Sequence, residues 1–265
     1  MPDPGIHSIV LFGAGNFATN LALALKKKGY DILQVYNRTA GNGNKLAEKA
    51  GAVFINDLSE VNTKADLYII SVRDSAIEMI AGQLHLKDKI IVHTSGSMDI
   101  SILQKASSNF GVLHSPQTFS KTKPISFNNL YIDIQANNKH CEGVLVEFAK
   151  TFCKNVIVVT AEQRIFIHVA AVFAGNFTNF MYTIAEDILS GRDLPFELMQ
   201  PIIKKTSENS NYKKPFTRQT GPAVRDDFEV IAKHMDILGK NNYPDYQKLY
   251  VLISDTILKY KKLHE

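Results

Sequence analysis

The sequence has few of the features that mark secreted, membrane-bound or metal-stabilised proteins. Only two of its 265 residues are cysteines, Cys141 and Cys153, and they form no C-x-x-C pair, which argues against a disulfide framework or a cysteine zinc site. The first residues do not combine a charged segment with an apolar one, so we expect no secretory signal. No apolar run approaches the roughly 18–20 residues that span a bilayer. We therefore expect a cytoplasmic protein that does not enter the membrane.

Strong charge is also missing. The net charge is only +4, and the one short lysine run, at 26–28, stands where the first helix is expected to end and where cations suit the helix dipole. We therefore expect no nucleic-acid partner. The histidines at 93, 114 and 168 lack metal-ligand spacing, so we expect no metal site. With 45% hydrophobic and 21% charged residues, the composition is that of a globular protein with one large domain or two modest ones.

The first 160 residues alternate short apolar runs with helical patterns. Strands are expected at 7–12, 32–36, 52–55, 67–71, 89–93, 111–114, 130–134 and 156–159. Helices are expected from Phe17 to a C-cap at Gly29, and at 42–50, 75–84 and 138–153, with a loop at 121–129. Short connections between strands and helices imply right-handed crossovers and a mostly parallel sheet. The fold class is therefore α/β, a Rossmann-type doubly wound sheet followed by an all-helical C-terminal domain.

The composition changes near Thr160, where we place the boundary between a domain at 1–160 and a helical domain at 161–265. Residues 161–190 read as one long helix, interrupted only by Gly175, and its middle is apolar almost all round, which predicts burial on several sides. Further helices are expected at 195–210, 222–238 and 243–262. Pro195 and Pro222 would stand in first turns, where proline is tolerated.

The strongest motif is Gly-Ala-Gly-Asn-Phe-Ala at 13–18, which follows the first strand and opens a helix. Gly13 permits the tight turn, Gly15 lets the backbone approach a diphosphate, and Ala18 allows the helix to pack closely on the strand. Asn16 and Phe17 begin the helix, whose amides and dipole would face the phosphates. The pattern favours a dinucleotide site over glycines that serve only a tight turn.

The end of the second strand indicates which dinucleotide binds. An NAD site usually has Asp or Glu about 20 residues after the motif, but here the strand ends in Asn37, Arg38 and Thr39, with no acid. The planar guanidinium of Arg38 suits a 2′-phosphate, and Thr39 adds a hydroxyl. NADP(H) is therefore favoured, the alternative being that Arg38 is a solvated loop residue.

Loops after later strands are expected to complete the cofactor site, because ligands bind at the carboxyl ends of the strands in such sheets. Ser71, Val72 and Arg73 follow one strand, and Thr94 and Ser95 follow the next. The same small and polar residues also suit ordinary strand-to-helix turns, so both readings stay open here.

Candidate catalytic residues occur in two segments. His114 and Gln117 belong to His-Ser-Pro-Gln-Thr-Phe at a strand end, and His168 and Asn176 lie on the long helix, with Asn179 on nearly the same stripe as His168. Imidazole titrates near neutral pH and can serve as a general acid. The alternatives are a structural histidine at 114 and core hydrogen bonds or a dimer seam on the helix.

A third candidate segment is Gly-Pro-Ala-Val-Arg-Asp-Asp at 221–227. Acids suit the start of a helix, whereas Arg225 stands against that preference. Arg225 is therefore a candidate to bind an anion or a second subunit, with helix capping as the alternative function of the segment.

Taken together, the motifs resemble the Rossmann-like NADP oxidoreductases that carry a helical C-terminal domain of unknown function. The resemblance rests on the glycine turn, Asn-Arg-Thr at 37–39, His-Ser-Pro-Gln-Thr-Phe at 114–119, the 168–177 segment and Gly-Pro-x-x-Arg at 221–225. The chain is more distantly similar to ketopantoate reductase, pyrroline-5-carboxylate reductase, β-hydroxyacid dehydrogenases and deazaflavin-dependent NADP oxidoreductases. The resemblance implies a site between the domains, a nicotinamide near Thr94 and Ser95, and a helical domain that often forms dimers.

One position departs from those relatives. The β-hydroxyacid dehydrogenases and ketopantoate reductase place a catalytic lysine four residues before an asparagine, and if Asn176 is that asparagine, the lysine position holds Val172. A lysine-based mechanism therefore does not carry over, and His168, one turn earlier, is a candidate substitute.

These observations predict an NADPH-dependent reductase, or a dehydrogenase running in reverse, that acts on C=O or C=N of a small anionic substrate. His168 or His114 would donate the proton, Ser95, Gln117 and Asn176 would orient the reacting group, and Arg225 would bind an anionic group. The competing hypotheses are a non-catalytic NADP sensor and a structural helical dimer with a vestigial nucleotide fold. A homodimer through the C-terminal helices is expected.

Overall fold

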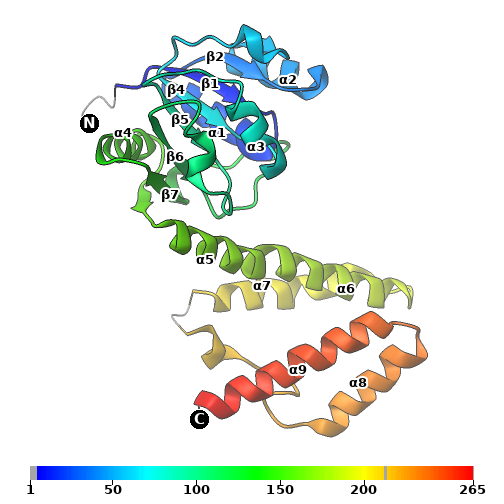
Figure 1. The fold of residues 1–265 in the computed structure, drawn as a ribbon. Coiled ribbons are helices and arrows are strands. Elements are labelled where there is room, and N and C mark those ends of the chain that lie inside the picture. Colours follow the sequence, from blue (N-terminus) through cyan, green and yellow to red (C-terminus); the bar gives the residue numbers. More distant parts are fainter. Residues whose placement is uncertain (1–4, 212–213, 265) are drawn as a thin grey trace. The chain divides into compact units, whose positions relative to one another are not determined.

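The computed structural model describes residues 5–211 and 214–264, and the chain divides into two compact units, Met1–Phe177 and Thr178–Glu265 (Figure 1). The first unit contains the sheet and the beginning of the long helical run, and the second is helical. The predicted assignment of residues 1–160 to NADP binding and 161–265 to substrate binding and dimer formation stays a prediction.

The first unit is built on one eight-stranded sheet with the order β3-β2-β1-β4-β5-β6-β7-β8. All strand pairs are parallel except β6–β7, which is antiparallel. The strands are β1 (Ser8–Phe12), β2 (Asp31–Tyr36), β3 (Val53–Ile55), β4 (Leu67–Ile70), β5 (Ile90–His93), β6 (Asn109–His114), β7 (Tyr131–Ala136) and β8 (Asn155–Val158). Each expected strand is present within two residues, which confirms the mostly parallel α/β fold.

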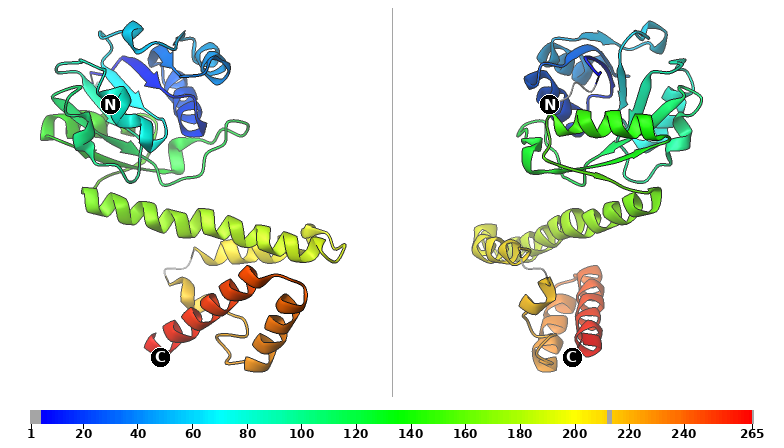
Figure 2. Two further views of the ribbon diagram at one scale, coloured as in Figure 1. Left: turned by 45° about the vertical axis from the view of Figure 1, so that its right-hand side comes forward. Right: turned by 90° about the vertical axis from the view of Figure 1, so that its left-hand side faces the viewer.

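Helices cover both faces of this sheet (Figure 2). The helices of the first unit are α1 (Asn16–Lys27), α2 (Ala40–Ala50), α3 (Asp74–Ala81), α4 (Lys139–Lys150) and α5 (Ala161–Ala171). Leu21 of α1, Leu46 of α2 and Phe148 of α4 belong to the core on one face, whereas Ile77 of α3 belongs to the core on the other. The central strands β1, β4 and β5 are apolar on both sides because both faces are buried there, as the continuous apolar runs in the sequence indicated. The reversal of strand order around β1 and β4 creates the crevice in which such folds bind ligands.

The predicted long helix at 161–190 is helical throughout but is not one α-helix. A π-helical segment, Val172–Phe177, separates α5 from α6 (Thr178–Ser190). Such segments often occur at functional sites, and the wider turn changes which residues share a face. The expected common stripe of His168 and Asn179 is therefore wrong, because it assumed an uninterrupted α-helix.

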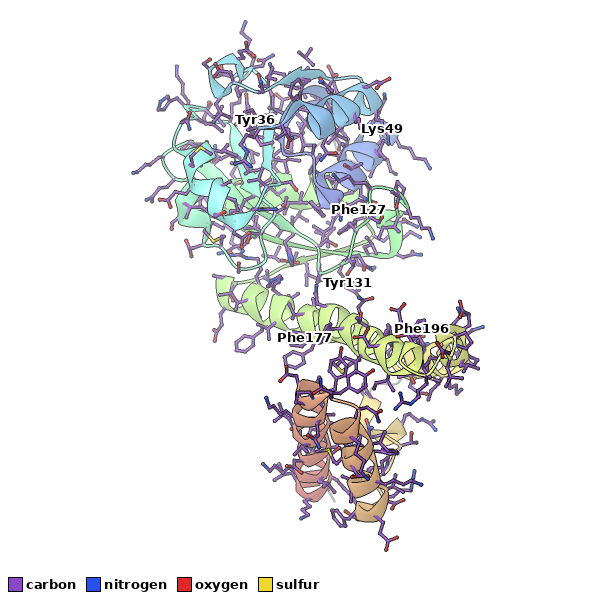
Figure 3. All side chains as sticks on the ribbon, turned by 90° about the vertical axis from the view of Figure 1, so that its right-hand side faces the viewer. Tyr36, Lys49, Phe127, Tyr131, Phe177 and Phe196 are labelled. Carbon is purple, nitrogen blue, oxygen red and sulfur yellow. The ribbon has the colours of Figure 1, made fainter. Side chains whose placement is uncertain are left out.

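The expected burial of this run on several sides is also not found. Phe166 is 67% exposed, Phe173 64% and Phe180 51%, and Figure 3 shows Phe177 on the side of the run away from the sheet. A single copy of the chain covers only part of a helix that is apolar all round. By length and composition the run Ala161–Ser190 could cross a membrane, which corrects the expectation that no segment reaches this threshold, although core helices of globular proteins meet the same criteria.

The second unit packs helices against one another, with α8 and α9 side by side (Figure 1). Beyond α6 its α-helices are α7 (Gln200–Asn209), α8 (Phe228–Lys240) and α9 (Pro244–His264). The helices expected from Pro195 and Pro222 begin later. Pro195 instead caps a short 3-10 turn before α7. At the other site Asp226 has a left-handed φ of +56° and Asp227 caps α8, so the chain enters the helix only at Phe228.

Candidate functional site

The glycine turn joins the ends of three neighbouring strands. Gly13 has a φ of +107°, and a Cβ added there would lie 2.1 Å from the Ser71 carbonyl oxygen, so only glycine fits. Its N–H donates to the Tyr36 carbonyl at 2.7 Å, and the Ser71 N–H donates to the Phe12 carbonyl at 2.7 Å. The turn therefore holds the carboxyl ends of β1, β2 and β4 together at the crevice.

The start of α1 is open toward a ligand. Gly15 is the N-cap, no side chain caps the helix, and its first turn contains no acid. A Cβ at Gly15 would meet no atom within 4 Å, so the space beside the turn is empty of protein. Ala18, at the third motif position, is fully buried and packs in the core rather than lining the site. The first-turn amides and the helix dipole thus face a space that suits a diphosphate.

A cavity of about 710 Å³ lies at this turn, within the size range of cofactor pockets. Its charges are of one sign, because Arg38, Arg73 and Lys121 line it and no Asp or Glu does. The lining also includes Gly13, Gly15, Asn16, Phe17, Asn37, Thr39, Ser71, Val72 and Thr94, as expected, together with Ala14, Tyr36, Asn42, Ser75, Ala76, Met79 and Ile80. We refer to it as the cofactor cavity.

Arg38 stands where β2 meets α2. It is exposed and makes no ion pair with the rest of residues 5–211 and 214–264. The Asn37 side chain donates to the carbonyl and the hydroxyl of Thr39, at 2.7 and 3.1 Å, and so shapes the loop. Thr39 is the N-cap of α2, which no side chain caps and whose first turn contains no acid. A guanidinium beside an uncapped helix start fits a phosphate group.

Lys121 reaches the cofactor cavity from the loop that follows β6. The buried Asn20 on α1 holds this loop: its Nδ2 donates to the Ser120 carbonyl at 3.0 Å, and its Oδ1 accepts from the Ile125 N–H at 2.9 Å. Phe119 adds an edge-to-face contact with Phe17, with ring centroids 5.0 Å apart. The sequence analysis treated this segment only as a loop and missed Lys121, since its position depends on contacts with α1.

A second cavity of about 250 Å³, which we call the histidine cavity, lies between the end of β6 and the run of α5 and the π segment. Its lining comprises His114, Ser115, Pro116, Gln117, Thr118, His168, Ala171, Val172, Ala174, Gly175 and Asn176. The His114 and His168 rings meet edge to face, with centroids 6.0 Å apart. Val172 thus lines the cavity together with Asn176, and its match to the lysine position of the distant relatives stays a prediction.

Gly96 makes room for His168. A Cβ at Gly96 would lie 2.6 Å from Nδ1 and 2.9 Å from Cβ of His168, so a larger residue would push the imidazole away. Thr94, two residues earlier, lines the cofactor cavity. The short segment after β5 therefore separates the two cavities. Gly96, the residue of this segment that lies against His168, has no side chain.

A buried polar layer lies beneath that segment. Arg164, on α5, is only 1% exposed, and its Nη1 donates to the Ser95 carbonyl at 2.8 Å while Nη2 donates to Gln135 Oε1 at 3.1 Å. The Ser95 N–H donates to His93 Nδ1 at 3.2 Å. Burial, and then the nearby positive charge of Arg164, lowers the pKa of His93 to about 4. His93 is therefore neutral at pH 7 and supports the loop.

The remaining predicted site residues do not all lie at the same cavity. The Ser95 hydroxyl accepts from the N–H groups of Ser97 and Met98, both at 3.1 Å, so it shapes the turn. Gln117 and Asn176 are exposed and line the histidine cavity. Arg225 is exposed in the second unit, in the turn before α8, and its role stays a prediction.

Besides Lys121, two further functional candidates in the first unit were missed, Asp133 and Arg164. Asp133 looks like any polar residue within a strand, and Arg164 like a charged residue in the first turn of a helix. A weak signal existed for the second, because a capping box of Thr160 and Gln163 fixes the start of α5. That start places Arg164 and His168 one turn apart on the same side of the helix.

Two protein-family models match the chain, one in its N-terminal part and one in its C-terminal part. Residues 8–96 match the family described as NADP oxidoreductase, coenzyme F420-dependent, and residues 130–257 match a domain of unknown function, DUF2520. No curated protein matches the chain.

Solved structures resemble it along nearly its whole length. A protein from Bacteroides fragilis, named "putative NADP oxidoreductase", is 40% identical, with 97% of this chain and 100% of that chain covered and a TM-score of 0.90. An imine reductase from Myxococcus stipitatus in complex with NADP+ is 14% identical, with 97% and 95% covered and a TM-score of 0.68. A 1-pyrroline-5-carboxylate reductase from Streptococcus pyogenes is 10% identical, with 95% and 98% covered and a TM-score of 0.60.

The last two similarities concern the fold alone, whereas the similarity to the Bacteroides protein is close in both sequence and structure. The chain therefore belongs to the family of NADP oxidoreductases that join an N-terminal Rossmann-type domain to a helical C-terminal region.

Proposed function

We propose that this NADP oxidoreductase is a reductase that transfers a hydride from NADPH to C=O or C=N of a small anionic substrate held in the histidine cavity. The observation that carries the proposal is the pairing of two cavities on either side of the segment after β5. One contains three cations and no carboxylate, and the other contains two imidazoles. Run in the opposite direction, the same residues would serve a dehydrogenase.

The cofactor cavity has the groups that NADP(H) requires. The glycine turn and the uncapped start of α1 suit the diphosphate, with Lys121 and Arg73 as further cations, and Arg38 with Thr39 suits the 2′-phosphate. When bound, the cofactor supplies the hydride. Thr94 and Val72 would border its nicotinamide end, next to the loop that leads to the second cavity.

The histidine cavity has donors where a reduced C=O or C=N needs them. His114 or His168 would give a proton to the oxygen or nitrogen of that bond, while Gln117 and Asn176 would orient it. A volume of about 250 Å³ suits a small molecule, and the cavity lining contains no carboxylate that would repel an anion. Arg225, in the second unit, is proposed to bind an anion, and Ser95 to hold the loop through its hydroxyl.

One observation favours a second candidate function. Val172 places an apolar side chain at the cavity where distant relatives use a lysine. A non-catalytic protein that senses NADP(H) would need the cofactor cavity but no proton donor. The two functions differ in whether NADPH is consumed.

A screen for NADPH oxidation tests the choice. The purified protein would be mixed with NADPH and a panel of ketoacids, cyclic imines and sugar-acid derivatives, and absorbance at the nicotinamide band would be followed. We expect turnover on at least one anionic member. Tight NADPH binding with no turnover on the whole panel, and unchanged binding in His168→Ala, would favour the sensor.

We also propose a homodimer that forms through the C-terminal helices and buries the apolar side chains of 161–190. The large exposed fractions of Phe166 and Phe173 support it, because monomeric proteins rarely expose a continuous apolar surface. Analytical ultracentrifugation tests the dimer: Phe166→Glu with Phe173→Glu should give a monomer, whereas Val53→Glu, an equally exposed apolar residue on β3, should not. A wild-type monomer would contradict it.

The compartment is proposed to be the cytoplasm, without a membrane or nucleic-acid partner. Both cysteines are free and buried. Burial raises the pKa of Cys141 to about 12 and also raises that of Cys153, so neither thiol is reactive at neutral pH. Two unpaired, inert thiols are what a reducing compartment permits.

A further inference from the structure

His114 of the histidine cavity has a buried carboxylate behind it. The antiparallel register of β6 and β7 pairs His114 with Asp133, and Asp133 Oδ1 lies 2.9 Å from His114 Nδ1. Asp133 is 1% exposed and His114 7% exposed, so water does not compete for this bond. A carboxylate only accepts hydrogen bonds, so Nδ1 must be the donor. That leaves Nε2 as the ring nitrogen available to the cavity.

Asp133 in turn has a buried cation near it. A carboxylate removed from water needs a compensating charge, and Arg164 interacts electrostatically with Asp133 from α5. Two buried polar atoms of this pair, Asp133 Oδ2 and Arg164 Nε, have no hydrogen-bond partner in the described chain. A carboxylate on β7 and a guanidinium on α5 are therefore buried together behind His114, and the cation compensates the charge of the carboxylate.

We propose that Asp133 is a positioning residue that acts through His114, and that the Asp133–His114 pair is the proton donor of the reductase. The inference rests on the function proposed above and names the donor that the sequence left open. Asp133 accepts the hydrogen bond from Nδ1–H and so fixes the ring with Nε2–H facing the substrate.

The step balances as a two-electron reduction. The substrate carbon of C=O or C=N gains the hydride, and the π electron pair moves to the oxygen or nitrogen. His114 Nε2 gives its proton to that atom, which becomes the hydroxyl or amine of the product. The neutral imidazole that remains regains a proton from water after product release, and Asp133 keeps its hydrogen bond to Nδ1–H.

His168 has a different environment. Its ring lies against Gly96 and meets the edge of His114, but no carboxylate pairs with it in the described ranges. Charged or titratable groups on the elements beside His114 are Asp133 on β7, Arg164 and His168 on α5, and His93 on β5. Within the described residues, Asp133 is the one that hydrogen-bonds to the His114 ring. His168 is then a neighbour that contacts substrate, and His114 the donor.

The tautomer of His114 tests the pairing without any substrate. Side-chain 15N NMR of the protein alone, with the signal assigned through His114→Gln, reports which ring nitrogen carries the proton. We expect Nδ1 to stay protonated across the titration in the wild type. In Asp133→Asn, Arg164 should attract the amide oxygen and leave the NH2 group facing Nδ1, so the neutral ring should carry its proton on Nε2. A wild-type neutral ring protonated on Nε2 would overturn the proposal.

Kinetics on the best substrate of the NADPH screen separate positioning from mere stability. Asp133→Asn should lower kcat roughly a hundredfold and change its pH profile, the size expected for a lost general acid, with NADPH affinity unchanged. The matched control is Asp66→Asn. Asp66 accepts from the N–H and hydroxyl of Ser8 at 3.0 and 2.8 Å at the opposite end of the strands, so its loss should lower stability and leave kcat and its pH profile unaltered.

The outcomes distinguish this inference from the function on which it rests. Turnover by the wild type together with an unchanged kcat in folded Asp133→Asn would overturn the pairing and leave the reductase intact. The expected tautomer with no turnover on any substrate would instead overturn the reductase, since the pair would then exist without the reaction. If Asp133→Asn does not fold, the wild-type tautomer still decides the assignment.

Discussion

The two cavities of the first unit are built in different ways, although a single segment after β5 separates them. The cofactor cavity lies at the ends of parallel strands, where the glycine turn and the starts of α1 and α2 present backbone amides beside the cations Arg38, Arg73 and Lys121. The histidine cavity is formed by side chains from β6, the loop after it, α5 and a π segment. Backbone amides at a glycine turn and at helix starts suit phosphate groups, whereas imidazole and amide side chains can donate protons and orient a reacting group. We therefore expect the cofactor cavity to bind a dinucleotide and the histidine cavity to determine which substrate is accepted.

The cofactor cavity is tested most sharply by a substitution that adds one methyl group to the glycine turn. Gly13→Ala combines a left-handed φ with a contact of 2.1 Å to Ser71 O, so we expect a loss of about 3 kcal/mol or more in unfolding free energy, and of NADPH binding. Urea unfolding and a NADPH fluorescence titration measure the two. Gly15→Ala is the control: its Cβ meets no protein atom, so stability should hold while NADPH affinity falls. Equal stability of both variants would contradict this account.

The unfolding free energy should depend on pH through His93, which belongs to the buried polar layer beneath the segment after β5. The pKa of His93 lies at about 4 in the fold and near 6.5 in the unfolded chain, so the unfolded state binds a proton first. Its contribution is fully present above pH 6.5 and is lost as the pH falls toward 4, by on the order of 3 kcal/mol in total. Unfolding free energies measured between pH 4 and 7 should therefore fall less steeply in His93→Gln than in the wild type. Parallel curves would show that His93 does not titrate in this way.

The choice of dinucleotide is expected to depend on one side chain of the cofactor cavity. Arg38→Ala should weaken NADPH much more than NADH, because a charge-assisted hydrogen bond to phosphate is worth about 1.5–3 kcal/mol, tenfold or more in affinity. Isothermal titration with both cofactors measures the ratio. Arg73→Ala, on the loop after β4, should weaken both alike. Equal weakening of NADPH and NADH binding in Arg38→Ala would contradict the assignment of the 2′-phosphate to Arg38.

The separation of the two cavities has its own test. Gly96→Ala places a methyl group against His168, so we expect kcat/KM on the best substrate to fall by about 1–2 kcal/mol in transition-state stabilisation, with NADPH affinity unchanged. Gly143→Ala, on α4 and outside both cavity linings, is the control, because its Cβ would meet no atom within 4 Å. If NADPH affinity in Gly96→Ala fell as much as kcat/KM, the substitution would affect both cavities, and their separation would be contradicted.

The two cavities also differ in how far sequence reasoning reached them. The residues of the glycine turn and of 37–39 are contiguous, and their chemistry follows from strand, turn and helix start, so eleven of the twelve predicted cofactor residues line the cavity, with Ala18 packed behind it. In the histidine cavity the sequence identified His114, Gln117, His168 and Asn176 but could not choose between the histidines. That choice depends on Asp133, which lies on the next strand and is recognisable only through the register of β6 and β7.

The sequence by itself determined the sheet, the glycine turn and the preference for NADP(H), because each follows from residues that are neighbours along the chain and from local backbone geometry. Only the tertiary structure decided three further features: the π segment within 161–190, the position of Lys121 at the cofactor cavity, and the buried pairing of Asp133 with His114 and Arg164. The physical reason is that a buried charge is stable only when partners from other elements surround it, and strand register and helix packing bring those partners together.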